Sequence, residues 1–334
     1  MGDIFRKLYG RGIFFGVVVA AAPASALTIN PFFDASITGA GNAVAVVSAI
    51  NAAISTVNSL YSNAGTVGIV FKQSASVLGQ SQSADYNLTY SSYVSLLTAR
   101  SAAFPGNSIL SSAVANLGSG NGANGLTNVS MTTADYRVAL GGLGGSSCFN
   151  SGGLFVTTCG QVYDGVITIS NSLNYGTTPV GGLYSAITVT QHELNEILGG
   201  GGQGTTLGQT GATSFGTLDL YRYSAPGVAS YATATTATAY LSVNGGATSI
   251  VAFNQSGVGD YADFAPSGHV QSAFGTPGIV TSYTTASPEF AMMQSIGYSG
   301  FAVPVPEPGS LVMLGLGLVG LRALRRARGR QATS

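Results

Sequence analysis

Residues 183–202 read LYSAITVTQHELNEILGGGG, and this stretch decides how the rest of the chain is interpreted. Its apolar spacing predicts a helix over 183–198 that ends at the four glycines 199–202. At about 100° per residue, Glu196 lies about 40° from His192 around the helix axis, and Glu193 about 100° from it. These three polar side chains therefore share one face. The other face is apolar and carries Leu194, Ile197 and Leu198.

The polar face has the residue types of a metal site. An imidazole and a carboxylate four residues apart on a helix can bind one ion, so His192 and Glu196 are candidate ligands. Glu193 points beside them, where a carboxylate could take a proton from a metal-bound water. The alternative is a solvated helix face. The chain has only two His and four Glu, and Ser, Thr and Asn supply most of its other polar residues, which favours the metal site.

Charge is scarce and unevenly distributed. Only 7% of residues are charged, and the formal net charge is zero. Residues 1–26 carry three bases and one acid, and residues 304–334 carry five arginines and one glutamate. The body, residues 27–303, carries four dispersed bases and ten acids. An acidic body of this kind argues against nucleic acid as a partner.

The N-terminus has the pattern of a secretory signal. Three basic residues precede an apolar stretch at 13–22, and residues 24–26 read ASA, a small-x-small cleavage site. This pattern predicts a signal peptide over 1–26 and a mature chain that begins near Leu27. A retained membrane anchor is the alternative, but the apolar stretch is too short to span a bilayer.

The C-terminus has three parts in a fixed order. Pro-Glu-Pro at 306–308 is followed by an apolar run at 311–321 and then by the five arginines. Basic residues after an apolar segment stay cytoplasmic, which places the body outside the cytoplasm. This order resembles the PEP-CTERM sorting signal of Gram-negative bacteria. The resemblance implies that 304–334 form a transmembrane sorting helix, recognised by an exosortase at the inner membrane. It also implies an inner-membrane tether until sorting, and then release to the cell surface or the extracellular matrix.

The body is expected to be a single α+β domain over 27–303. The order of elements is helix, strand, helices, strands, the central helix and then a loop-rich C-terminal part, without regular alternation. Helices are predicted at 43–61, 90–103, 108–117, 183–198 and 290–296. One strand is predicted at 67–71 and one or two within 155–169. Strands are also predicted at 240–243 and 249–253, joined by an Asn244-Gly245 hairpin turn.

Two cysteines, Cys148 and Cys159, lie on either side of a glycine-rich stretch. Because export is predicted, we expect one local disulfide between them, with two free thiols as the alternative. The pair lacks the CxxC spacing of many zinc sites.

The central helix resembles the zinc-binding helix of zincin metallopeptidases, whose pattern is H-E-x-x-H-x-x-G-x-x-H. His192, Glu193 and Gly199 match that pattern, whereas Glu196 and Gly202 stand where zincins have histidines. The chain is more similar to PEP-CTERM-bearing predicted metalloproteases with an H-E-x-x-E helix. That similarity continues at 218–224, 240–253, 259–263, 273–278 and 292–298. It implies a zincin-like fold, with a small sheet and a central active-site helix.

A metal held by His192 and Glu196 needs at least one more ligand. Asp219 is the first choice, because a glycine-rich loop before it could return the chain to the helix; the alternative is a turn or cap acid paired with Arg222. Asp260 and Asp263 are second candidates, as ligands, as structural residues or as weak calcium ligands.

Two further features have open roles. His269, the only other histidine, is either a ligand or an incidental loop residue. Met292 and Met293 are similar to the methionine-containing turn beneath metzincin zinc sites, or they are ordinary core residues.

Together these features predict an exported zinc-dependent peptidase that uses Glu193 as its general base. The expected cofactor is Zn²⁺, with Ca²⁺ as the alternative, and the expected partners are a peptide or protein substrate and the exosortase. The alternative function is a non-catalytic cell-surface or extracellular-matrix protein with a structural or decayed metal site. The Gly-, Ser- and Thr-rich, nearly charge-free composition favours that alternative. Glu193 separates the two functions, because a structural site needs no base.

Overall fold

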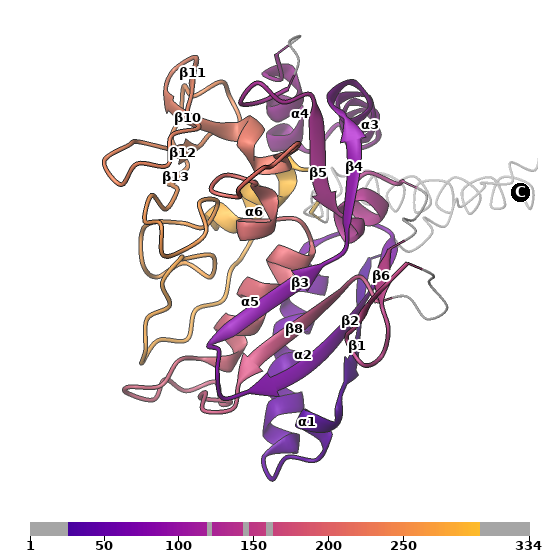
Figure 1. Ribbon diagram of the computed structural model, residues 1–334, viewed down its shortest axis with the longest axis vertical. Coiled ribbons are helices and arrows are strands. Elements are labelled where there is room, and N and C mark those ends of the chain that lie inside the picture. The colour runs from indigo at the N-terminus through magenta and orange to yellow at the C-terminus, as the bar shows by residue number, and fades with distance from the viewer. Residues whose placement is uncertain (1–25, 119–121, 143–146, 158–162, 301–334) are drawn as a thin grey trace, which may run out of the picture.

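The computed structural model describes residues 26–118, 122–142, 147–157 and 163–300. All but the last residue of the predicted signal peptide, and the whole predicted tail 304–334, lie outside these residues. The described part is an α+β structure with several small sheets, as predicted (Figure 1).

The sheet beside the central helix has four strands in the order β1-β2-β8-β3. Strands β1 (Leu27–Phe33), β2 (Gly65–Ser74) and β8 (Gly165–Ser170) are parallel. Strand β3 (Gly79–Ser83) pairs antiparallel with β8, and no described strand pairs with its other edge. The middle of β2 is buried without alternation, as expected for a strand covered on both faces.

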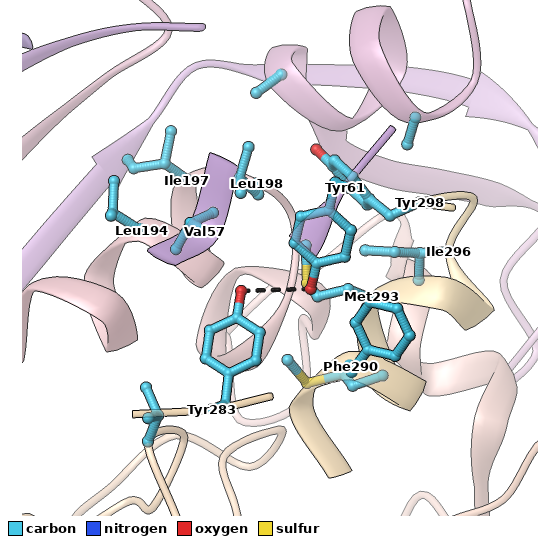
Figure 2. Close-up of a cluster of buried hydrophobic side chains, with 14 of the residues drawn as sticks. Val57, Tyr61, Leu194, Ile197, Leu198, Tyr283, Phe290, Met293, Ile296 and Tyr298 are labelled. Atoms are coloured by element: carbon cyan, nitrogen blue, oxygen red, sulfur yellow. Dashed lines mark hydrogen bonds between the residues drawn. The ribbon is translucent and has the colours of Figure 1, made fainter. Parts of the chain in front are cut away.

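Two helices lie side by side on one face of this sheet, behind it in the view of Figure 1. They are α2 (Ala43–Leu60) and α5 (Ala186–Ile197), the predicted central helix. Helix α2 is long and apolar enough to cross a membrane by length and composition alone. Its buried residues, however, face the sheet and α5, so it is a core helix. Figure 2 shows Leu194 and Ile197 of α5, and Leu198 directly after it, close to Val57 of α2, as the apolar face predicts.

Both ends of α5 follow from local sequence. The helix begins three residues later than predicted, because the Ser185 side chain accepts a hydrogen bond from the Thr188 N–H and caps it. It ends at Ile197, two residues before Gly199, whose φ of +96° favours glycine. The Gly200 N–H then donates to the Asn195 carbonyl at 2.8 Å. The glycine run therefore turns the chain sharply beneath the polar face.

Most other predicted elements are present, with bounds that match or differ by a few residues. The predicted hairpin is confirmed, since β12 (Tyr240–Leu241) pairs antiparallel with β13 (Val251–Ala252). The segment 155–169 is two strands, β7 (Phe155–Val156) and β8. The helices are α3 (Tyr90–Ala103), α4 (Ser108–Ala115) and α6 (Pro288–Ser295). The patterns did not predict β1, β3, α1 (Ala35–Thr38), β4 (Asp85–Thr89), β5 (Asn128–Thr132), β9 (Phe215–Gly216), β10 (Arg222–Ala225) or β11 (Val228–Ala229).

Cys148 lies on β6 (Cys148–Phe149), which pairs with β7. It is disulfide-bonded, in line with the predicted bridge. Cys159 lies outside the described residues.

Candidate metal centre

Three side chains from two distant segments meet at the polar face of α5. His192 Nε2 lies 3.7 Å from Glu196 Oε1 and 3.6 Å from Asp263 Oδ2. One potential ligand atom from each residue lies within 4.8 Å of the other two. Glu196 and Asp263 are buried, and His192 is half-buried. Within the described residues, this is the only group of three or more His, Cys, Asp or Glu with such geometry.

The separations and donor types fit a zinc ion. Two ligands about 2.1 Å from a tetrahedral Zn²⁺ lie roughly 3.4 Å apart, close to the two distances from His192. One imidazole and two carboxylates would neutralise a divalent charge and leave a fourth position open. Ca²⁺ prefers six to eight oxygen ligands, so this nitrogen-containing set suits it less well.

Backbone and amide groups hold these three side chains in place. The Nδ1 atom of His192 lies 2.9 Å from the Val270 carbonyl, which fixes Nδ1 as the donor and leaves Nε2 facing the carboxylates. The Gln271 amide donates to Asp263 Oδ1 at 2.9 Å. Gly201 makes room for this amide, since a Cβ at Gly201 would lie 2.1 Å from Gln271 Nε2.

The hydrogen bonds continue from Gln271 into the core. Gln271 Oε1 accepts from Asn195 Nδ2 at 3.1 Å, and Asn195 Oδ1 accepts from the Tyr283 hydroxyl at 2.9 Å. The Tyr283 and Tyr61 hydroxyls are 3.3 Å apart, as Figure 2 shows. A buried chain of polar groups thus links the end of α2 to the third ligand. Asn195 and Gln271 were not predicted, because neither residue type marks a metal site in a sequence.

Glu193 lies beside the ligands, and its side chain is directed at strand β3. A Cβ at Gly79 would lie 2.4 Å from Glu193 Oε1, so this glycine makes room for the carboxylate. Glu193 is 5% exposed and Glu196 is 6% exposed. The alternative of a solvated helix face is therefore wrong. Burial and the charge of Glu196 raise the pKa of Glu193 well above its usual range. A cation bound nearby would favour its ionised form.

The third member of the group is Asp263, a second candidate in the sequence, and the first choice, Asp219, does not belong to the group. The carboxylate of Asp219 is buried and accepts hydrogen bonds from the Thr205 hydroxyl and the Gly216 N–H, at 2.5 and 2.8 Å. It caps the short 3₁₀ helix 217–221, as the cap alternative proposed. The predicted pairing with Arg222 is not a close ion pair, because the Arg222 guanidinium donates to the Tyr261 carbonyl.

The remaining candidates surround the centre. Asp260 is exposed and lines the same cleft, as does His269, but neither belongs to the three-residue group. A Cβ at Gly202 would lie 2.7 Å from Asp260 Cγ and 2.8 Å from Glu196 Oε1, so a histidine would not fit there. Met292 is buried beneath the glycine turn, with its Sδ 3.5 Å from the Gly201 nitrogen.

The centre lies at a cleft of about 350 Å³. His192, Glu193, Glu196 and Asp263 line it, together with Leu78 and residues 79–81 of β3. The other lining residues come from the start of α5 and from the loops within 258–281. Volume and mixed polarity are in the range of small-ligand sites.

Metal binding is expected to tighten as the pH rises from 6 towards 9. Burial alone would lower the pKa of His192, but Asp263, Glu193 and Glu196 raise it to about 9. Burial raises the pKa of Asp263 to about 7. Both groups must lose a proton to bind the ion, so affinity should rise roughly tenfold per pH unit above 7 and more steeply below it. Competition with a chromophoric chelator at pH 6, 7 and 8 measures this. An affinity independent of pH would contradict the ligand assignment.

Comparison with known proteins identifies the C-terminal segment. Residues 304–328 match the PEP-CTERM protein-sorting motif, which confirms the signal predicted there. No curated protein and no solved structure matches the chain. The chain is therefore an exported protein with a C-terminal tail that directs membrane-anchored sorting by an exosortase. The metal centre rests on the geometry described above.

Proposed function

We propose that this exported protein is a zinc-dependent peptidase, released at the cell surface or into the extracellular matrix after sorting. One observation carries the proposal. Two carboxylates and an imidazole converge in a cleft, with a further buried carboxylate, Glu193, beside them but outside the ligand group. A purely structural metal site does not need a buried carboxylate, such as that of Glu193, beside its ligands.

His192, Glu196 and Asp263 would hold the ion. When bound, zinc polarises a carbonyl oxygen and lowers the pKa of a water molecule. Glu193 would accept the proton of the attacking water and pass it to the leaving amine. The Val270 carbonyl and the Gln271 amide would keep His192 and Asp263 in position during this transfer.

Strand β3 supports a peptide as the substrate. Its free edge lies at the cleft, where Gly79, Gln80 and Ser81 line the wall. An extended peptide can add to a free strand edge through main-chain hydrogen bonds. The Ser81 hydroxyl donates to Glu196 Oε2, so this strand also contacts the ligand set. A peptide paired with β3 would pass directly beside Glu193 and the metal ligands.

Metal content tests the proposal. The full-length protein is loaded with zinc, dialysed and subjected to elemental analysis beside His192→Ala. About one zinc per chain is expected in the wild type and little in the variant, with cleavage of a mixed peptide library by the wild type only. If neither protein retains metal, the peptidase proposal fails and the non-catalytic surface protein remains. If the wild type retains zinc but cleaves no peptide, the site is structural.

A further inference from the structure

The wall of the cleft carries apolar side chains that the fold leaves exposed. Leu78 is 38% exposed, Ile279 44% and Phe274 50%, and all three line the cleft. Val258, also in the lining, is 89% exposed. Covering such side chains removes apolar surface from water, which favours binding of an apolar partner.

These side chains are held in a fixed arrangement. A Cβ at Gly275 would lie 3.2 Å from Tyr184 Cδ1 and 3.6 Å from Leu78 Cδ2, so the loop that carries Phe274 reaches the start of β3. The Gly278 N–H donates to the Leu183 carbonyl at 2.8 Å, which ties the same loop to the entrance of α5. The Thr188 hydroxyl donates to the Thr281 carbonyl at 2.8 Å and accepts from its N–H at 2.9 Å. The apolar wall is thus already formed before a ligand binds.

The side chains that line the cleft include four carboxylates and few basic groups. Apart from Tyr184, its ionisable lining residues are the carboxylates Glu193, Glu196, Asp260 and Asp263 and the two histidines, without a lysine or arginine. The four bases of the described body make their hydrogen bonds elsewhere. Lys72 donates to Gly152, Arg100 to Gly297, Arg137 to Asp164 and Arg222 to Tyr261. The cleft therefore offers no lysine or arginine to pair with an acidic side chain, and Asp260 remains as a negative charge in the lining once zinc offsets its ligand carboxylates.

We infer that the cleft selects extended peptide segments with bulky apolar side chains. Leu78, Phe274 and Ile279 contact those side chains, while the free edge of β3 pairs with the peptide backbone. The inference rests on the proposed function for the choice of a peptide, but it concerns binding and does not require cleavage.

Binding to an inactive chain tests it. Four blocked octapeptides of Gly, Ala and Ser are compared, with Leu, Phe, Ser or Glu at the two central positions. The affinity of each peptide for the zinc-loaded Glu193→Gln variant is measured by calorimetry. The Leu and Phe peptides should bind at least about tenfold more tightly than the Ser and Glu peptides. Adding Phe274→Ser to this variant should weaken its binding of the Leu and Phe peptides about tenfold. Phe155→Ser is the matched control, because Phe155 is 56% exposed but lies outside the cleft lining.

The outcomes separate this inference from the peptidase proposal. Tight binding of the Leu and Phe peptides without cleavage by the wild type supports the inference and refutes the peptidase. Cleavage by the wild type with equal affinity for all four peptides overturns the inference and supports the peptidase. If no peptide binds and none is cleaved, both are overturned. The inference would also be overturned if Phe274→Ser and Phe155→Ser weakened peptide binding equally, because the apolar wall of the cleft would then not account for the affinity.

Discussion

Replacement of Glu193 by glutamine is expected to lower kcat for peptide hydrolysis by about 10²- to 10⁴-fold. Glutamine has the same shape and fits the space beside Gly79, but its amide cannot accept a proton. Because Glu193 is outside the ligand group, zinc content should remain near that of the wild type. Single-turnover kinetics on an apolar peptide, with elemental analysis of the same sample, measures both quantities.

Glu196→Gln is the matched comparison for this variant. It makes the same chemical change one turn away, in a residue that faces His192 Nε2 at 3.7 Å. We expect this protein to lose zinc, and with it activity. If zinc-loaded Glu193→Gln kept more than about a tenth of the wild-type kcat, Glu193 could not be the base.

Asp263→Asn is expected to weaken zinc binding by at least about 100-fold. The loss of groups that only orient a ligand already costs 10- to 100-fold in affinity, and Asp263 is assigned as a ligand itself. Asparagine preserves the volume and can keep the acceptor for the Gln271 amide, so the fold should be retained. Chelator competition gives the affinity, and circular dichroism verifies the structure.

Asp219→Asn is expected to lower the stability of the fold without weakening zinc binding. Asp219 is buried and accepts hydrogen bonds from Thr205 and Gly216 without belonging to the ligand group. Its replacement should lower stability by about 1–3 kcal/mol and leave zinc affinity within about twofold. Thermal unfolding and the same competition assay report the two effects. If Asp219→Asn lost zinc and Asp263→Asn kept it, the original choice of third ligand would be restored.

The helices were the most predictable part of the fold. Helix α5 is set by local features, namely the apolar spacing, the Ser185 cap and the glycine stop. Strand β3 reads GQSQS and has no alternation of apolar residues, so nothing local distinguishes it from a loop. Its conformation comes from pairing with β8, which is distant in the sequence.

The residues of the candidate site also differ in how far the sequence alone predicts them. His192, Glu193 and Glu196 share one helix, so helical geometry alone places them together. The choice between Asp219 and Asp263 depends on how the loop-rich C-terminal part folds back, and spacing does not determine that. One local signal was available for Asp219. It is the third residue after Gly216 at the start of a short helix, where an acidic side chain commonly satisfies a free backbone N–H.

The edge of β3 that no described strand covers has a cost for an exported protein. A strand edge that can accept a peptide can also accept the edge of another molecule, which is how chains aggregate. Proteins commonly protect such edges with lysine, proline or a bulge, yet β3 offers only Gly, Gln and Ser, and glutamine side chains can add ladders of their own. The protection must therefore come from the cleft. The edge lies at the cleft, so a single peptide segment would reach it more easily than the broad sheet of a second copy.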